Sequence, residues 1–474
     1  MGAKTSQLIE LGRGASRAYT DDAWYGVEYD ITSPSTALTR IGRADLIASQ
    51  PIYNSFNARV KRDDRSTAYT LSASNHLYKE DGVTLADLSG TDGQVIIDMP
   101  AHYRKIETVG NIVRIKMSEY PLPGFSQVKK YGFGKYLASI DASGKLSSVA
   151  GAMPATSVSC DMSSATGFGK RATNRGAGWA PVKWSAWNDL LMCELVYTAN
   201  FNSQGAISTG ITDANATDWV ARGYGAVKPN GNSNHFGLYT GSAAVVINNW
   251  YKGSTTGVST NKCISTGRFA SWNASYVGMT IRNEANSLTA TIVSKDNNDQ
   301  ITLSADIFTA TSQQFTIVNS AYSTQSSVFA GIEDFFGHLW QWTAGILINI
   351  SNYGIPEQLN KAYIAQLHSQ FADTITANYI HIGIIATSSG YVTRMMPGYQ
   401  LPVSVGGSSA TYMSDYFYSS GGAGLRLVLC GGSAHYGADA GSRSVNANNT
   451  PGIANFIVGS RLGLEYTDSE QANR

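Results

Sequence analysis

Few side chains in this sequence have the types and spacing needed for catalysis or metal binding. The four cysteines, Cys160, Cys193, Cys263 and Cys430, lie far apart and form no C-x-x-C motif or cysteine–histidine pair at zinc spacing. The chain has no G-x-S-x-G nucleophile elbow, no phosphate-binding P-loop and no H-E-x-x-H motif. We therefore predict buried, reduced thiols, no catalytic residues, no metal and no cofactor.

Paired carboxylates could still support glycoside hydrolysis, which requires two of them to meet in a cleft. Glu333 with Asp334, or Asp98, are the candidates, but any chain with 34 acidic residues offers such pairs. The glycine-rich stretch 222–237 lacks the strand–turn–helix spacing of a phosphate loop. We predict that the protein is not an enzyme.

The charge pattern disfavours nucleic acid as a partner. The 35 basic and 34 acidic residues nearly cancel, and no polybasic run occurs, whereas binding to phosphates requires clustered Lys and Arg. No apolar run reaches the length of a membrane span, and the first residues lack the apolar region of a signal peptide. We expect synthesis in the cytoplasm and no membrane span.

Two segments are expected to form the central elements. In residues 183–201 the apolar side chains of Trp184, Trp187, Leu191 and Leu195 recur at spacings of three and four, which predicts a helix packed on the core. Residues 331–350 predict a central strand with two indoles on one face, and His338 is expected to be a hydrogen-bonded core histidine. The triplet at 187–189 also occurs in calcium-binding animal lectins on a strand, but its place in a helix argues against calcium here.

The segment 429–462, LCGGSAHYGADAGSRSVNANNTPGIANFIVGSRL, has an unusual composition. Lys, Glu, Gln, Met and Trp make up 61 of the 474 residues, yet residues 414–464 contain none of them. Dense packing of a glycine-rich β segment would produce part of this depletion.

Three blocks, GQVIIDMPAHY, FGHLWQWTAGI and GLRLVLCGGSAHYGADAG followed by VGSRL, give the chain a family resemblance. It resembles the variable proteins of diversity-generating retroelements and receptor-binding tail proteins of phages, whose C-terminal part has a C-type lectin fold of the formylglycine-generating-enzyme type. The resemblance implies an α+β, loop-rich C-type lectin fold in which adenine-directed mutagenesis diversifies a surface. The enzymatic relatives use paired cysteines, and Cys430 has no second cysteine beside it.

The resemblance and the composition together divide the variable region, about 412–460, into a fixed frame and contact residues. Glycines that take left-handed or closely packed conformations, together with Ala438 and Ala440, are expected to form the frame, which Gly459, Arg461 and Leu462 close. Arg461 is expected to donate to backbone carbonyls or a carboxylate. The frame glycines are Gly431, Gly432, Gly437 and Gly441.

The predicted ligand contacts have the composition of an antibody paratope, with Tyr for rigid area and Ser and Asn for adaptable hydrogen bonds. We expect His435, Tyr436 and Arg443 to contribute most of the binding energy. The tyrosines at 416 and 418 either rim the same surface or are ordinary strand aromatics. The predicted contacts are Ser433, Ala434, His435, Tyr436, Asp439, Ser442, Arg443, Ser444, Asn446, Asn448, Asn449, Asn455, Tyr416 and Tyr418.

We expect an N-terminal β region at 1–85, a lectin-like domain at 86–275 and 321–474, and a small inserted β domain at 276–320 whose ends lie close together. The resemblance implies a homotrimeric phage tail protein that binds a host cell-surface protein or glycan and other tail proteins. The bacterial cell surface is the alternative location. The alternative function is a structural tail or surface protein with a lectin-like domain that does not vary.

Overall fold

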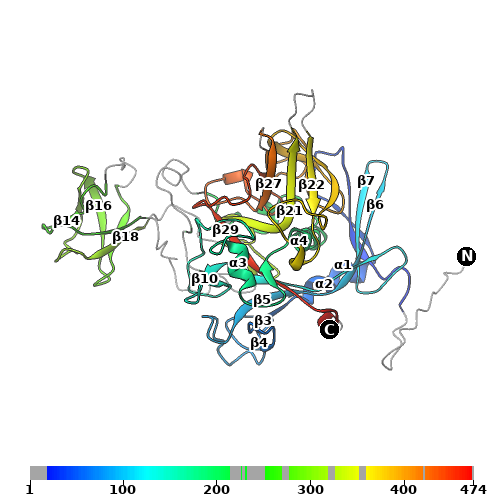
Figure 1. Cartoon of the computed structure of the whole chain (residues 1–474), viewed down its shortest axis with the longest axis horizontal. Coiled ribbons are helices and arrows are strands. Elements are labelled where there is room, and N and C mark those ends of the chain that lie inside the picture. Colours follow the sequence, from blue (N-terminus) through cyan, green and yellow to red (C-terminus); the bar gives the residue numbers. More distant parts are fainter. Residues whose placement is uncertain are drawn as a thin grey trace, which may run out of the picture.

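The computed structural model describes residues 19–213, 226, 230–231, 251–269, 277–318, 326–351, 359–419 and 422–471. The described residues are rich in β-structure, with 38% strand and 11% helix, as the many short alternating runs of the sequence predicted. Figure 1 shows the strands gathered into one large body and a smaller sheet that lies apart from it.

The large sheet contains fourteen strands among the described residues. Its main path runs in the order β25-β24-β26-β28-β27-β21-β29-β9-β5-β3-β4, while β12 pairs with β29, and β22 pairs with β21 and β23. Its strands are β3 (Asn57–Lys61), β4 (Thr67–Thr70), β5 (Gln94–Met99), β9 (Tyr131–Leu137), β12 (Trp179–Pro181), β21 (Trp340–Ser351), β22 (Leu359–Ile364), β23 (Ile380–Ile385), β24 (Gly390–Met395), β25 (Pro402–Val405), β26 (Tyr416–Ser419), β27 (Gly424–Cys430), β28 (Val445–Ala447) and β29 (Val458–Glu465).

A five-stranded sheet in the order β2-β1-β7-β6-β8 joins the N-terminal residues to the following segment. Strand β1 pairs with β7, and β3 pairs with β5, so strands on the two sides of residue 85 pair with each other. The predicted boundary at 85 therefore does not separate two sheets. The sequence did not indicate this, because pairing between distant strands leaves no local signal. The strands are β1 (Tyr25–Asp30), β2 (Thr39–Gly42), β6 (His102–Val109), β7 (Ile112–Ser118) and β8 (Ser126–Val128).

The smaller sheet of Figure 1 has six strands in the order β13-β18-β15-β16-β17-β14. The predicted insertion at 276–320 contains four of them, but β13 and β14 precede it, so this unit extends back to at least residue 251. Strand β13 pairs with β18, which brings the first and last strands of the unit together. The strands are β13 (Tyr251–Ser254), β14 (Lys262–Ile264), β15 (Thr280–Asn283), β16 (Thr289–Lys295), β17 (Gln300–Leu303) and β18 (Gln314–Val318).

The predicted central helix and strand are both present, as α4 (Trp184–Thr198) and β21. Helix α4 is buried on almost every side rather than along one stripe, and its tryptophans pack in the same core as Ile346 and Ile348 of β21. In Figure 1 it lies beside β21 and β22. The remaining elements are short: α1 (Ala44–Ser49), α2 (Pro51–Asn54), α3 (Phe168–Thr173), α5 (Ser203–Ala206), η2 (His368–Gln370), η3 (Gly437–Asp439), α7 (Asp468–Gln471), β10 (Ser139–Ile140), β11 (Leu146–Ser147), β19 (Val328–Phe329) and β20 (Ile332–Glu333).

Several predicted core roles are confirmed. His338 is fully buried, and its Nδ1 lies 2.9 Å from Asp334 Oδ2. The Arg461 guanidinium is buried and donates to Gln341 Oε1 at 2.9 Å and to four backbone carbonyls, those of Gly134, Lys135, Glu333 and Asp334. All four cysteines are buried and free.

The triplet at 187–189 takes part in contacts within the protein. The Asn188 amide donates to the Gly398 carbonyl at 2.9 Å, and the Asp189 carboxylate pairs with Arg104 at 2.5 Å. Both polar groups thus connect α4 to neighbouring elements.

Candidate functional site

The glycine-rich segment leaves β27 at Cys430 and returns to the sheet at β28, with the short helical turn η3 between them. Gly431 and Gly432 have φ values of 94° and 76°, in the left-handed region that favours glycine. A Cβ at Gly432 would lie 2.5 Å from the Cβ of Ala440, which is itself fully buried. The predicted frame role of these glycines is therefore confirmed.

Gly441 is required for a different reason. Its φ is ordinary, but a Cβ at this position would overlap the carboxylate of Asp415, which is also buried. Gly437, with φ of 53°, has open space around its Cβ position, and Ala438 is exposed. The prediction that Ala438 packs within the frame is wrong, because this residue lies at the outer side of η3.

The predicted contact residue Arg443 is fully buried and does not face solvent. Its guanidinium forms an ion pair with Glu194 of α4 and donates to the Leu191 carbonyl at 3.1 Å. Its backbone N–H donates to Asp415 Oδ2 at 2.7 Å. The surface assignment of Arg443 is thus wrong, since it attaches the segment to the central helix.

Burial shifts both acids that surround Arg443. It raises the pKa of the Glu194 carboxyl, although the neighbouring guanidinium opposes the rise. It raises the pKa of Asp415 to about 7, again against the effect of Arg443. The two acids and the arginine form a compact charged group beneath the segment, which we call the buried triad.

Five further predicted contacts are also buried, so the expectation that they face a ligand is wrong for them too. Ser442 donates to Glu194 Oε2 at 3.0 Å, and Ser444 donates to the Asp439 carbonyl. The small side chains at these positions fill space between the segment and the sheet, a role that composition alone does not distinguish from surface display. The five are Ser433, Ala434, Ser442, Ser444 and Asn446.

A second group of predicted contacts is partly exposed and lies together. Tyr418 of β26 and Tyr436 before η3 have ring centroids 5.3 Å apart, and both meet the Trp340 indole edge-on. His435 lies 4.5 Å from the Tyr436 ring, and Tyr416 lies 4.6 Å from Tyr418. Together with Tyr391 of β24, which was not predicted, these residues form what we call the tyrosine face; it consists of Tyr391, Tyr416, Tyr418, His435, Tyr436 and Asp439.

Asp439 is the hydrogen-bonding centre of the tyrosine face. Its two carboxylate oxygens accept from the Tyr391 hydroxyl at 2.5 Å and from the Tyr418 hydroxyl at 2.8 Å. Burial and the adjacent carboxylate raise the pKa of Tyr391 to about 12 and also raise the pKa of Tyr418. Both phenols therefore keep their protons at neutral pH and serve as donors to Asp439.

Hydrogen bonds from α5 and from the segment that follows it hold the backbone of η3 in place. The Gln204 amide in α5 donates to the carbonyls of Gly437 at 2.8 Å and Ala440 at 2.6 Å, while Gly437 N–H donates to the Thr212 carbonyl at 2.7 Å. These bonds fix the backbone of the turn without using the side chains of residues 438 and 439.

Sequence reasoning missed four residues that build this site: Glu194, Gln204, Tyr391 and Asp415. Tyr391 is 48 positions from Asp439, and Glu194 is 249 positions from Arg443, so no spacing rule connects either pair. Tyr416 and Tyr418 were expected either to rim the surface or to be ordinary strand aromatics. They lie on strand β26 and also belong to the tyrosine face.

The three remaining predicted contacts, Asn448, Asn449 and Asn455, lie beyond β28 and are exposed or partly exposed. The side-chain oxygen of Asn446 accepts from the Asn448 backbone and from the Asn449 amide, at 2.9 and 3.2 Å. These asparagines thus support the loop 448–455, and no aromatic contact links them to the tyrosine face within the described residues.

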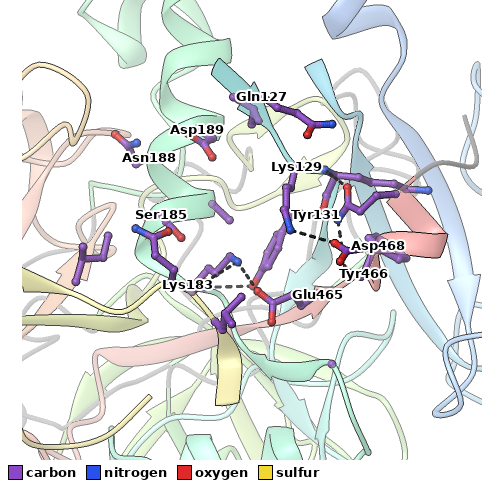
Figure 2. Close-up of a pocket in the computed structure, with 18 of the residues that line it drawn as sticks. Gln127, Lys129, Tyr131, Lys183, Ser185, Asn188, Asp189, Glu465, Tyr466 and Asp468 are labelled. Atoms are coloured by element: carbon purple, nitrogen blue, oxygen red, sulfur yellow. Dashed lines mark hydrogen bonds and ion pairs between the residues drawn. The ribbon is translucent and has the colours of Figure 1, made fainter. Parts of the chain in front are cut away.

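A cleft of about 1020 Å³ lies apart from the tyrosine face, between the start of α4, β9 and the residues after β29. Figure 2 shows Lys183 beside Tyr131 and Glu465, with Lys129 and Asp468 on the other side. Each cation that lines the cleft has an acidic partner, so its charges largely neutralise one another. The ion pairs are Lys183–Glu465, Arg104–Asp189, Lys129–Asp468, Lys130–Asp98 and Arg65–Glu470.

No family model matches the chain, and no curated protein matches it significantly. Among the described residues, no helix combines the length and apolar character needed to cross a bilayer. The same part of the chain contains no group of three or more His, Cys, Asp or Glu placed to hold a metal ion.

Proposed function

We propose that this protein binds a ligand on the surface of another cell through the tyrosine face, as a receptor-binding protein of a phage tail. The observation that carries this proposal is the separation within one segment between a buried frame and a cluster of partly exposed aromatic side chains. A surface that must recognise ligands gains rigid amphipathic area from tyrosine at low entropic cost.

The frame supports the proposal because it fixes the backbone independently of the exposed side chains. Left-handed glycines, the Gln204 amide and the buried triad hold the segment through groups that no ligand would contact. Substitutions at 435, 436, 438 and 439 would thus change the surface without removing these interactions. Such tolerance is what a diversified site of the retroelement type on a C-type lectin fold would require.

Assembly into a homotrimer is part of the proposal. A single small site of this size binds weakly, and several linked copies raise avidity through effective concentration. We place the protein in the virion, and the proposed partners are a host surface protein or glycan and other tail proteins.

The first test is binding of labelled protein to a panel of intact bacterial strains, measured by flow cytometry. Tyr436→Ala and Tyr418→Ala should each reduce binding to a responsive strain by about tenfold or more, since truncated hot-spot residues cost about 2 kcal/mol or more. The control is Asp468→Asn in the cleft of Figure 2, which should bind as the parent does. Retained binding in both tyrosine variants would contradict the proposal.

The second test is the distribution of natural variation. Sequencing the 3′ part of the gene in related isolates should show changes at adenine-bearing codons concentrated at residues 435, 436, 438 and 439 and sparse at 441–447. A uniform segment without a nearby near-copy template would favour the structural tail protein instead.

A further inference from the structure

The hydrogen bonds of the tyrosine face determine which ligand groups it can receive. The hydroxyl protons of Tyr391 and Tyr418 are both directed to Asp439, so these two groups are already committed as donors. An ionised carboxylate has about four lone-pair sites, and two remain on Asp439 after these bonds. The centre of the face therefore offers acceptors to a ligand.

The electrostatics of the face point in the same direction. Asp439 contributes the one carboxylate among the six residues of the face, and burial lowers the pKa of His435, which keeps its imidazole neutral at pH 7. The negative faces of aromatic rings attract cations, and four tyrosine rings lie around this carboxylate. The face thus combines a formal negative charge with several electron-rich surfaces.

Other aromatic rings of the chain show what such surfaces accept. Lys79 Nζ lies 4.4 Å from the Tyr69 ring centroid, and Lys116 Nζ lies 4.5 Å from that of Trp24. Within the described residues, no lysine or arginine lies over a ring of the tyrosine face, and none forms an ion pair with Asp439. No cation from the described part of the chain thus occupies the corresponding position on the face.

We propose that the tyrosine face recognises a basic segment of a protein partner by taking one protonated lysine or arginine side chain against its rings and Asp439. This inference rests on the proposed function and adds the ligand class to it. Acidic glycans would meet a like charge at Asp439, and neutral glycans would donate hydroxyl protons to it without any charge to pair with it. A basic side chain satisfies both the free acceptors and the ring faces.

The test uses the full chain and fluorescence polarisation with a labelled short peptide in which lysine alternates with glycine. The same peptide with every lysine acetylated keeps the length and removes the charge. We expect the acetylated peptide to bind about tenfold more weakly or worse, and binding of the basic peptide to weaken as sodium chloride is added. An arginine–glycine peptide should bind at least as well as the lysine peptide.

Variants separate the tyrosine face from other acidic surfaces. Asp439→Asn should weaken binding of the basic peptide by about tenfold, and Tyr418→Phe by a smaller factor, because the phenylalanine keeps the ring and loses only the hydrogen bond. Asp468→Asn, at an exposed carboxylate on the cleft, should leave the affinity within about twofold. Thermal melts of each variant establish that folding is intact.

Two outcomes overturn the inference. One is equal binding of the basic and acetylated peptides; the other is a basic-peptide affinity that Asp439→Asn leaves unchanged. If either occurs while Tyr436→Ala and Tyr418→Ala still reduce binding to intact cells as expected, the proposed function stands and only the ligand class is wrong. If the tyrosine variants bind cells normally, the proposed function itself fails.

Discussion

The buried triad and the tyrosine face both take residues from the stretch 435–443, but Arg443 of the triad is fully buried, whereas the residues of the face are partly exposed. Arg443 contacts the central helix with no exposed surface, whereas Tyr436 and Asp439, a few residues earlier, reach the outside. The composition of the stretch is therefore the result of two separate demands. In the buried half, packing keeps the side chains on either side of Arg443 small, and only the outer half is available for recognition.

The triad and the face also differ in how their charges are satisfied. In the triad, the Arg443 guanidinium pairs with buried Glu194 and its backbone N–H donates to buried Asp415, so removal of either member of the Arg443–Glu194 pair leaves an unpaired charge in the core. In the face, the Asp439 carboxylate is held by neutral hydroxyls at a partly solvated surface. Substitutions that break the Arg443–Glu194 pair should accordingly destabilise the protein, whereas substitutions in the face should alter binding.

The largest expected effect is that of Arg443→Ala. It leaves Glu194 buried without its partner, and breaking such a pair costs about 3–5 kcal/mol of unfolding free energy. Urea unfolding followed by circular dichroism measures this loss, with the exposed Arg62→Ala as the matched control, expected within about 0.5 kcal/mol of the parent. Equal stability of the two variants would remove the distinction between frame and face.

The next effect depends on pH and concerns Asp415. Its pKa of about 7 in the folded protein lies above the ordinary value of 3.8, so between these values the folded state retains a proton that the unfolded state releases. Stability from this group is thus highest at low pH and falls as pH rises toward 7, by about 2–3 kcal/mol between about pH 5 and pH 8. Asp415→Asn should therefore gain stability relative to the parent over that interval, as measured by unfolding at both pH values. A constant difference between the two proteins would contradict the shifted pKa.

A smaller loss is expected from Gly441→Ala, whose new methyl group would overlap the Asp415 carboxylate. Overpacking of this kind costs about 1–3 kcal/mol, measurable as a lower melting temperature. Ala438→Ser adds one atom to an exposed position of the same segment and should change stability by less than about 0.5 kcal/mol. If the two substitutions proved equally tolerated, the close approach at Gly441 would be disproved.

The smallest change in stability is expected from Asp439→Asn. The amide oxygen can still accept one tyrosine hydroxyl, so the loss is confined to a partly exposed hydrogen bond of about 1 kcal/mol or less. The same variant is expected to lose binding strongly, and this contrast is the signature of a recognition surface. A large loss of stability would instead assign Asp439 to the frame.

The elements with a clear local period could be predicted from the sequence. The spacing of the apolar residues gave the extent of α4 closely, and the aromatic run at 331–350 indicated strand β21. The anchoring role of Arg461 followed from a cation at the end of an apolar strand. The left-handed frame glycines also followed from residue type, because few other residues adopt such backbone angles.

The division of the glycine-rich segment into buried and exposed halves could not be predicted. Ser442, Arg443 and Ser444 have the same residue types as surface contacts, and their burial depends on Glu194 and Asp415, which lie far away in the sequence. Tyr391 joins the face only through the order of strands β24, β26 and β28 in the sheet. Long-range pairing determined these outcomes, and no local pattern encodes it.

The position of β29 has a consequence for defective gene products. This strand lies between β21 and β9 in the middle of the large sheet, pairing with the first in parallel and with the second in antiparallel orientation. A product that stops before Val458, through a nonsense change or frameshift, would leave two half-sheets with open interior edges. Unpaired edges of this kind template aggregation, so errors introduced upstream would yield insoluble, degradable chains rather than soluble proteins with a damaged surface.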